Sequence, residues 1–227
     1  MEFQLAKEQD LPGIRALWQE AFGDSPEAVD EFFSAFPSCR SYVARTVDRV
    51  CAMVHVLPQI LRAEGDSPAG YVYAVATAEQ YRGQGLCREL MAFSEQDLAL
   101  RGFACAVLTP GEPSLFRFYE KLGYEAVFTR NRTAFSGGQE ISVEEYAELR
   151  EGCLPIPHMV YGTDVLRYAQ EVYGLRFYQT ATGCAATSDT YTAECLPEDL
   201  GGAPFAMVKW LGDRQAVKNA YLGLALE

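Results

Sequence analysis

The sequence feature that most constrains the fold is a strand, a glycine-rich turn and a helix that follow one another without a break. Residues 71–77, YVYAVAT, are apolar and rich in aromatic and β-branched side chains, which is typical of a buried strand. The turn that follows carries Gly83 and Gly85, and residues 86–100, LCRELMAFSEQDLAL, have apolar side chains at helical spacing. This succession predicts a β-turn-α unit within a mixed α/β sheet.

The turn in this unit has the chemistry of an anion site. The first N–H groups of a helix have no partners within the helix and lie at the positive end of its dipole. Gly83 and Gly85 lack the Cβ atoms that would keep a ligand away from the backbone, and Arg82 and Arg88 add positive charge. The pattern predicts a diphosphate site, although a tight turn with solvent-facing arginines would explain the same residues taken alone.

The turn differs from the two commonest phosphate-binding motifs. A dinucleotide-binding turn has a third glycine where this chain has Arg88, and a P-loop continues with Gly-Lys and then Ser or Thr, which this turn does not contain. The residues around the turn must therefore decide which phosphate it binds.

The residues before this unit predict two helices and a pair of strands. Asp10 and Pro12 indicate one helix start, with Asp10 as the cap, and Ser25 with Pro26 indicates a second. Two strands and a polar loop are expected next, at residues 41–44, 50–57 and 62–70.

The residues after the unit continue the α/β pattern. Residues 103–109 form a predicted buried strand, and Ser114 is expected to cap a short helix that ends at Gly123. One or two further strands are expected within residues 124–135.

A domain boundary is predicted at Ser136-Gly137-Gly138, which separates a first domain, residues 1–135, from a smaller α+β region, residues 136–227. A capping box at Ser142 starts one helix of this region, and another is expected near Thr163. Its inward side chains are expected to be Val165, Leu166, Ala169 and Val172. Short strands are expected at FYQT, CAAT, TYTAEC, PFAMVKWL and AYLGLAL.

The charge balance excludes one class of partner. The chain has 19 basic and 31 acidic residues and a formal net charge of −12, whereas nonspecific nucleic-acid binding needs a basic face. We therefore expect no nucleic-acid partner. The sequence begins without a signal-peptide pattern and has no apolar run of transmembrane length, so we expect a cytoplasmic protein without a membrane partner.

The cysteines favour reduced thiols over disulfides or a metal site. There are seven, an odd number, without C-x-x-C spacing, and several stand in apolar strand-like runs. With only His55 and His158 as histidines, we expect no zinc or other metal site.

The residues around the glycine turn carry a resemblance to a known family. AVATAEQYRGQGLCREL, residues 74–90, resembles the acyl-CoA-binding motif of the GNAT superfamily of N-acetyltransferases, with Gln80, Gly83 and Gly85 at the positions of Q/R-x-x-G-x-G/A. A second block, the strand FACAVLT followed by SLFRFYEKLGY, is similar to the family's YEKLGF signature. The resemblance covers about residues 1–135.

This resemblance implies a fold and a cofactor site. The implied fold has a splayed central sheet, with pantetheine pairing with the strand at residues 75–77 and the pyrophosphate on the N–H groups of residues 82–87. One position departs from the family: Glu112 stands where an Asn that contacts pantetheine is common, so Ser114 or backbone is expected to replace it. The implied cofactor-binding residues are Val75, Ala76, Thr77, Arg82, Gly83, Gln84, Gly85, Leu86, Cys87, Arg88 and Ser114.

The resemblance also implies one catalytic residue. Tyr119 occupies the family's general-acid position, where a phenol faces the CoA sulfur, and the N–H near Val75 or Ala76 is the implied oxyanion donor. A Tyr flanked by apolar residues is also a common core residue, and that alternative stays open. A cysteine nucleophile at Cys87 is not expected, because no His partner is indicated. The general base is not assigned among Glu79, Glu112, His55, Tyr73 and Asp24.

The function implied is acetyl transfer from acetyl-CoA to a primary amine by direct transfer in a ternary complex. The acceptor is a small-molecule amine or a peptide or protein amine, and the sequence does not decide between a monomer and a homodimer. Two alternatives remain: a CoA-binding sensor without turnover, and an enzyme for a longer acyl-CoA. The aromatic residues of the C-terminal region either fill a small core or line an acceptor pocket: Tyr161, Tyr168, Tyr173, Phe177, Tyr178, Tyr191, Trp210 and Tyr221.

Overall fold

The computed structural model describes residues 1–130, 134–154, 157–196, 204–212 and 217–226. The chain divides into two compact units, each built from segments that are not consecutive. The first unit comprises Met1–Pro58, Ala69–Leu108 and Leu211–Asp213, and the second comprises Gln59–Pro68, Thr109–Trp210 and Arg214–Glu227. The predicted boundary at residues 136–138 falls within the second unit, and the division into domains there stays a prediction.

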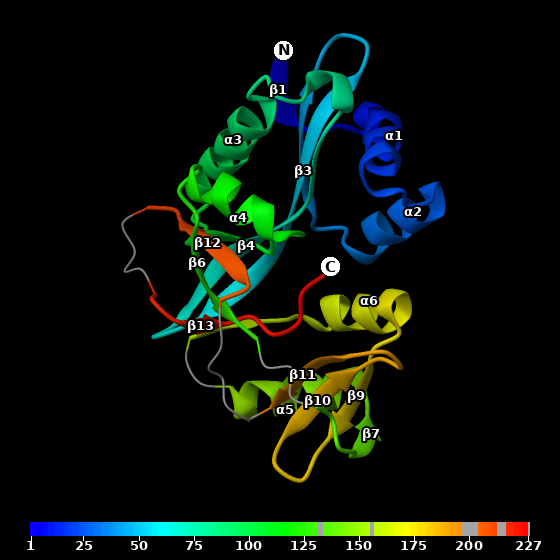
Figure 1. Cartoon of the computed structure of the whole chain (residues 1–227), viewed down its shortest axis with the longest axis vertical. Coiled ribbons are helices and arrows are strands. Elements are labelled where there is room, and N and C mark those ends of the chain that lie inside the picture. The colour runs from blue at the N-terminus through cyan, green and yellow to red at the C-terminus, as the bar shows by residue number, and fades with distance from the viewer. Residues whose placement is uncertain (131–133, 155–156, 197–203, 213–216, 227) are drawn as a thin grey trace. The chain divides into compact units, whose positions relative to one another are not determined.

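The first unit is a mixed sheet with helices on both sides. Its strands lie in the order β1-β2-β3-β4-β5, with β1–β2 and β2–β3 antiparallel and β4–β5 parallel. Helices α1 and α2 lie on one side of β3 and α3 lies on the other (Figure 1). The elements are β1 (Glu2–Leu5), α1 (Leu11–Phe22), α2 (Pro26–Ala35), β2 (Arg40–Arg45), β3 (Val50–Arg62), β4 (Asp66–Thr77), the short 3-10 helix η2 (Glu79–Tyr81), α3 (Leu86–Leu100) and β5 (Cys105–Leu108).

Ring contacts distinguish the two faces of this sheet. Trp18 of α1 lies 5.0 Å from His55 and 6.0 Å from Tyr73, measured between ring centroids. Phe93 of α3 lies 6.2 Å from Tyr42 of β2. Successive side chains of a strand point to opposite faces, so apolar residues that run continuously along β2 and β3 are buried on both sides.

The prediction of a polar loop at residues 62–70 is wrong. β3 continues to Arg62 and β4 already begins at Asp66, so only three residues connect the two strands. The Arg62 guanidinium donates to both carboxylate oxygens of Asp66, at 2.8 and 2.9 Å, across this connection. Gly70 was expected in this loop, but it lies in β4. A Cβ at Gly70 would come within 2.8 Å of Val56 Cγ1. Close packing, not a turn, requires this glycine.

The second unit contains two sets of paired strands and three helices in its described part. One set has the order β12-β6-β13-β8, with β8 also paired to the end of β3 at Ile60–Arg62, and the other has the order β11-β10-β9-β7. The elements are α4 (Pro113–Glu120), β6 (Glu125–Thr129), β7 (Gln139–Ile141), α5 (Val143–Cys153), β8 (His158–Val160), α6 (Thr163–Tyr173), β9 (Arg176–Gln179), β10 (Cys184–Thr187), β11 (Thr192–Leu196), β12 (Ala206–Trp210) and β13 (Ala220–Tyr221).

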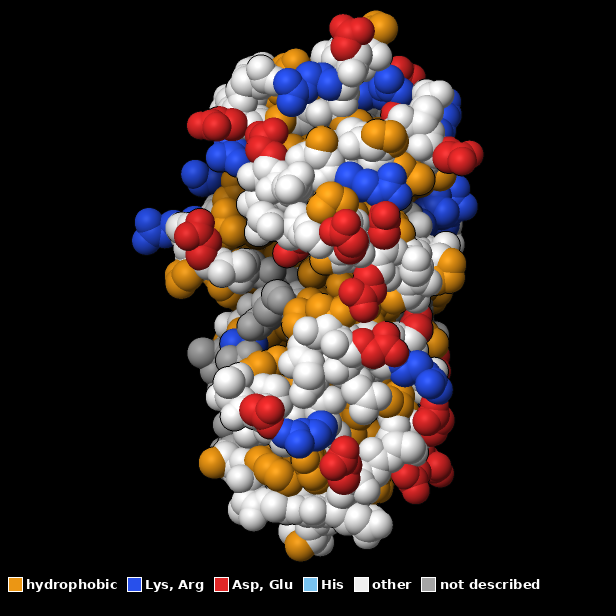
Figure 2. Space-filling model, turned by 90° about the vertical axis from the view of Figure 1, so that its right-hand side faces the viewer, with side chains coloured by type: hydrophobic (Ala, Val, Ile, Leu, Met, Phe, Trp, Pro, Cys, Tyr) orange, Lys and Arg blue, Asp and Glu red, His pale blue; other side chains and the backbone are white. Residues whose placement is uncertain are grey.

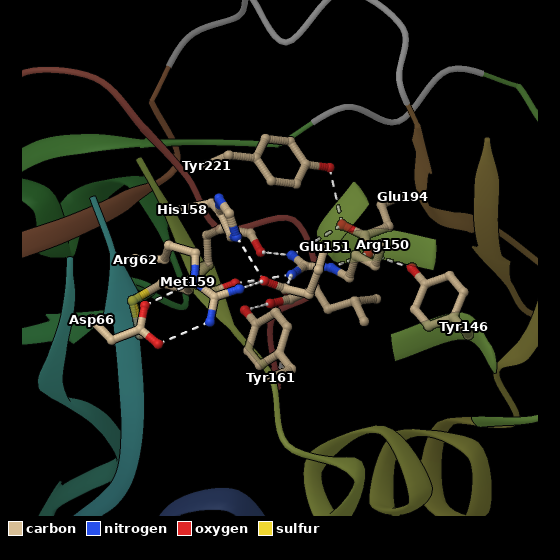
Figure 3. A network of polar contacts seen from close by, with 12 residues as sticks. Arg62, Asp66, Tyr146, Arg150, Glu151, His158, Met159, Tyr161, Glu194 and Tyr221 are labelled. Atoms are coloured by element: carbon tan, nitrogen blue, oxygen red, sulfur yellow. Dashed lines mark hydrogen bonds and ion pairs between the residues drawn. The ribbon is translucent and has the colours of Figure 1, made fainter. Parts of the chain in front are cut away.

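A buried ion pair joins α5 and β11 in the second unit (Figure 3). Arg150 Nε of α5 donates to Glu194 Oε1 of β11 at 2.7 Å, and the two side chains are 1% and 0% exposed. The hydroxyls of Tyr146 and Tyr221 also donate to Glu194. Arg150 donates in addition to the carbonyl oxygens of Met159 and Leu222. These charge-assisted bonds satisfy both ions, as burial of charge requires.

The C-terminal segment is held by the same network. Besides Leu222, the carbonyl of Leu224 accepts a hydrogen bond from the Tyr161 hydroxyl. At Gly223 a Cβ would lie 1.9 Å from Glu194 Oε2, so only glycine fits there. Of the eight C-terminal aromatic residues, Tyr161, Tyr168, Phe177 and Tyr221 are buried and belong to the core. Tyr173, Tyr178 and Trp210 are half-buried, and Tyr191 is 42% exposed.

Three details of the helices differ from expectation. Asp10 is the N-cap of α1, but its carboxylate accepts no capping bond from this helix. It accepts hydrogen bonds from the backbone N–H of Lys7 and from the side chains of Gln4 and Arg45 instead. Glu112, not Ser114, is the N-cap of α4, because Pro113 occupies the first helical position that proline favours. This helix ends at Glu120 rather than at Gly123, and Val172 of α6 is 40% exposed instead of inward.

The other predicted elements are confirmed within a few residues. Ser25 and Ser142 cap α2 and α5 through their side chains, the latter in a capping box with Glu145. The strands expected at FYQT, CAAT, TYTAEC and PFAMVKWL correspond to β9, β10, β11 and β12, whereas only the first two residues of AYLGLAL form a strand, β13. The short strands β1, β7 and β8 were not predicted.

All seven cysteines are free thiols, and Cys51, Cys105 and Cys184 are buried, in agreement with the predicted reduced state. Among the described residues, no helix is long and apolar enough to cross a membrane. Figure 2 shows acidic and basic side chains interspersed over one face, so the described side chains of that face form no continuous basic stripe.

Candidate functional site

The second half of β4 has an unusual backbone. Ala74 has φ +46°, the one positive φ of a non-glycine residue in the described part of the chain. Such a conformation costs about 1–3 kcal/mol and is found preferentially at active sites and ligand clamps. Ala74 lies one residue before Val75, Ala76 and Thr77, the strand residues that the family resemblance assigns to pantetheine.

The same part of β4 extends past its neighbour β5. The parallel register between the two strands covers Ala69–Tyr71 paired with Cys105–Val107, whereas β4 continues to Thr77. Val75 and Thr77 are half-buried and Ala76 is 7% exposed. The backbone of β4 on the β5 side is therefore placed to pair with an extended ligand over its last residues.

The turn after β4 has the backbone that its glycines predict. Gly83 has φ +74° and Gly85 has φ +83°, in the left-handed region that other residues rarely adopt. A Cβ at Gly83 would meet no protein atom within 4 Å, so the space above this residue is open to a ligand. The turn thus has both the conformation and the room that an approaching diphosphate requires.

The first turn of α3 supplies the donors. Gly85 is the N-cap of α3, and no described side chain caps this end of the helix. Leu86 is 7% exposed and packs into the core, which fixes the start of the helix, while Arg88 is exposed. An uncapped helix N-terminus with its positive dipole end in solvent binds anions.

Two side chains of the turn hold its own backbone. Arg82 Nε donates to the carbonyl of Thr77 at 3.1 Å, and Gln84 Nε2 donates to the carbonyl of Gln80 at 3.0 Å. Arg82 therefore closes the turn as well as adding charge to it.

Cys87 follows the N-cap and is half-buried. Burial raises the pKa of its thiol from 9.0 to about 11, which keeps the sulfur protonated at neutral pH. Burial therefore disfavours the thiolate, which is the reactive form of cysteine, and the absence of a nucleophilic role for Cys87 stays a prediction.

The candidates for the general base have different surroundings. His55 is fully buried, its Nδ1 lies 2.8 Å from Ser41 Oγ, and burial lowers its pKa from 6.5 to about 3. Asp24 accepts the indole N–H of Trp18 at 2.8 Å. Tyr73 is half-buried and stacks on Phe32 at 5.2 Å between ring centroids, whereas Glu79 and Glu112 are exposed. The burial of His55 removes it from contact with a substrate.

Tyr119 lies in α4, in the second unit, and is 7% exposed. Its ring contacts those of Phe118 and Tyr124 edge to face, at 5.2 and 5.8 Å between centroids. Ser114 lies in the first turn of the same helix and is exposed. The roles of Tyr119 as general acid and of Ser114 as a cofactor contact stay predictions, which rest on the sequence motif.

Sequence reasoning missed two residues of this region. Ala74 carried no signal, because alanine is not expected at positive φ. Glu20 of α1 accepts a hydrogen bond of 2.8 Å from the backbone N–H of Glu79, 59 residues later, and such a contact has no local signature.

Comparison with known proteins gives a family match and similar folds. A family model described as "Acetyltransferase (GNAT) domain" matches residues 2–127. A GCN5-related N-acetyltransferase from Kribbella flavida is similar with a TM-score of 0.66 and 19% identity, over 87% of this chain and 58% of that one. A GCN5-related N-acetyltransferase from Anabaena variabilis has a TM-score of 0.63 and 14% identity, over 84% and 56%.

A conserved protein from Enterococcus faecalis V583 is also similar, with a TM-score of 0.65 and 18% identity. The match covers 84% of this chain and 52% of that one, so this chain matches just over half the length of each of these three solved structures. At these identities the similarity concerns the fold. A search of curated proteins found no match.

Proposed function

The chain belongs to the GNAT acetyltransferase family, and from this premise we propose that it transfers the acetyl group of acetyl-CoA to a primary amine. The observation that carries the proposal is the continuous stretch from Ala74 to Leu86. It combines strained backbone in β4, an open glycine turn and an uncapped helix N-terminus within thirteen residues.

The residues of this stretch fit coenzyme A. The N–H groups of residues 82–87 would hold the pyrophosphate, since the glycine backbone is open and the helix dipole favours an anion. The end of β4, at residues 75–77, would pair with the amide groups of pantetheine, because β4 extends beyond its register with β5 there. Ser114 at the start of α4 is the proposed side-chain contact in place of the family's Asn.

Acetyl-CoA supplies an activated thioester, and the chain would supply donors and a proton. The amine nitrogen attacks the carbonyl carbon, the carbon–sulfur bond breaks, and the sulfur leaves with the bonding electron pair. The N–H of Val75 or Ala76 would donate to the carbonyl oxygen as negative charge develops on it. The Tyr119 hydroxyl would protonate the departing sulfur and recover a proton from solvent, and the attacking nitrogen would lose its proton to water.

The acceptor proposed is an amine of a small molecule, bound together with acetyl-CoA. An amine must be neutral to attack, so activity should rise with pH through the pKa of the acceptor. The proposal rests on the stretch from Ala74 to Leu86, which concerns the cofactor. The acceptor amine must therefore be identified by screening.

The test combines binding and turnover. Calorimetry with acetyl-CoA is expected to show binding, and acetyl-CoA should also raise the melting temperature by linkage. Product CoA from a panel of amines should be measured by chromatography, because the seven cysteines of the chain would react with thiol reagents. Absence of binding at millimolar acetyl-CoA would contradict the proposal. Binding without turnover of any amine would favour a CoA sensor.

A further inference from the structure

Glu20 and the first residue of η2 are joined by a hydrogen bond between distant parts of the first unit. The Oε1 atom of Glu20, near the end of α1, accepts the backbone N–H of Glu79 at 2.8 Å. Glu79 stands four residues before Gly83, the open glycine of the anion-binding turn. The Glu20 carboxylate is held beside the turn by this bond, and its charge opposes anion binding there, so its benefit must lie in the hydrogen bond that it accepts.

The neighbouring amide is fixed as well. The N–H of Ala78 donates to the carbonyl of Cys51 in β3 at 2.9 Å, and Ala78 is fully buried. Two consecutive amides, those of Ala78 and Glu79, are thus bound to two different elements, β3 and α1. Since a peptide group is planar, these two bonds set the direction in which the chain leaves β4.

Hydrogen bonds carry this direction into the turn. The N–H of Tyr81 donates to the carbonyl of Ala78 at 2.8 Å, and the N–H of Arg82 donates to the carbonyl of Glu79 at 3.1 Å. The Arg82 side chain then returns to the carbonyl of Thr77. The peptide groups on both sides of Glu79 therefore determine where the backbone stands when it reaches Gly83.

We propose that Glu20 is a positioning residue for the acyl-CoA pyrophosphate, acting through the backbone of Glu79 on the turn at Gly83–Gly85. The proposal rests on the proposed function, because it assigns the turn to coenzyme A. Glu20 does not touch the ligand in this role. It keeps the donors of the turn in one orientation, which lowers the entropy that binding must remove.

Two neutral substitutions separate the hydrogen bond from the charge. Glu20→Gln keeps an oxygen that can accept the Glu79 N–H, whereas Glu20→Ala removes it, and both lose the negative charge. One net hydrogen bond is worth about a factor of three to ten in an equilibrium constant. We expect Glu20→Ala to raise the Kd for CoA and the KM for acetyl-CoA about threefold to tenfold, with kcat at saturation unchanged. Glu20→Gln should bind CoA as well as the unmodified chain or better.

Calorimetry with CoA and steady-state kinetics measure these effects, and the melting temperature checks the fold of each variant. Glu31→Ala, an exposed residue of α2, is the matched control for loss of one glutamate and should leave the Kd unchanged. Equal Kd values for the unmodified chain and Glu20→Ala would overturn the inference alone. If the unmodified chain does not bind CoA, the proposed function and this inference are overturned together. A fall in kcat with constant Kd and KM would also contradict a positioning role.

Discussion

Arg150 and Glu194 form an ion pair of 2.7 Å between Nε and Oε1, 44 residues apart in the chain and both withdrawn from water. Removing one member of such a pair leaves the other charged and buried, which costs about 3–5 kcal/mol. We expect Arg150→Met to lower the free energy of unfolding by this amount, measured by denaturant or thermal unfolding.

The control for this prediction is Arg167→Met. Arg167 pairs with Glu144 on the surface, where an ion pair contributes about 0–1 kcal/mol. Similar losses of stability in the two variants would show that burial of the Arg150–Glu194 pair is not what makes it important.

His55 predicts a loss of stability in mild acid. Burial lowers its pKa from 6.5 to about 3, so the folded state keeps the ring neutral while the unfolded state takes up a proton below pH 6.5. The resulting loss of folding stability is absent above pH 6.5 and grows as the pH falls. It stops growing below the pKa that His55 has in the folded state. At pH 4 it amounts to about 3 kcal/mol at 1.36 kcal/mol per pKa unit.

Unfolding measured between pH 7 and pH 4 checks this effect. His55→Phe keeps a ring among Trp18, Phe32 and Phe33 and removes the titrating group. We expect the variant to lose less stability than the unmodified chain over this range. An identical pH dependence would mean that other groups cause the acid sensitivity.

Gly83 offers a clean test of the cofactor turn. A Cβ at Gly83 would meet no protein atom within 4 Å but would occupy the space of the proposed pyrophosphate. We therefore expect Gly83→Val to weaken CoA binding by ~10-fold or more. Gly102→Val is the matched control, because Gly102 also has positive φ and open surroundings but follows the end of α3. Calorimetry should show weaker CoA binding for Gly83→Val alone, while both variants lose similar stability from backbone strain.

Tyr119 distinguishes an acid catalyst from a packed ring. Tyr119→Phe keeps the contacts with Phe118 and Tyr124 and removes only the hydroxyl. General acid catalysis typically raises the rate by a factor of about 10²–10⁴. We therefore expect kcat to fall by ~10-fold or more, with an unchanged Kd for CoA. Tyr124→Phe controls for loss of a nearby phenol and should keep its activity. Full activity of Tyr119→Phe would assign Tyr119 to packing.

A fragment of residues 1–135 tests the predicted domain boundary. In the full chain β6 pairs with β12 on one side and β13 on the other, and both lie beyond residue 135. The fragment would leave both edges of β6 unpaired, and unpaired edges promote aggregation. We therefore expect lower solubility and a lower melting temperature than for the full chain. A stable, monomeric fragment that binds CoA would establish the boundary.

Much of the first unit could be predicted from short stretches of sequence. Ser25 with Pro26 marked the start of α2, and Gly83 with Gly85 marked the turn before α3, because caps and positive φ angles depend on a few adjacent residues. Where a signal was local but ambiguous, packing decided the outcome. Gly70 is in a strand because Val56 and Leu98 leave no room for a side chain, which residues 62–70 alone do not reveal.

By itself, then, the sequence determined the β-turn-α unit and the positive φ angles of Gly83 and Gly85, since the physical causes lie within a few consecutive residues. Only the tertiary structure decided that Glu20 holds the amide of Glu79, that Arg150 neutralises Glu194, and that the strained residue of β4 is Ala74. The contacts of Glu20 and of Arg150 each join segments that are distant in the chain and close in space. A residue's own neighbours in sequence impose no such constraint, because loop closure brings distant groups together only when the whole unit folds.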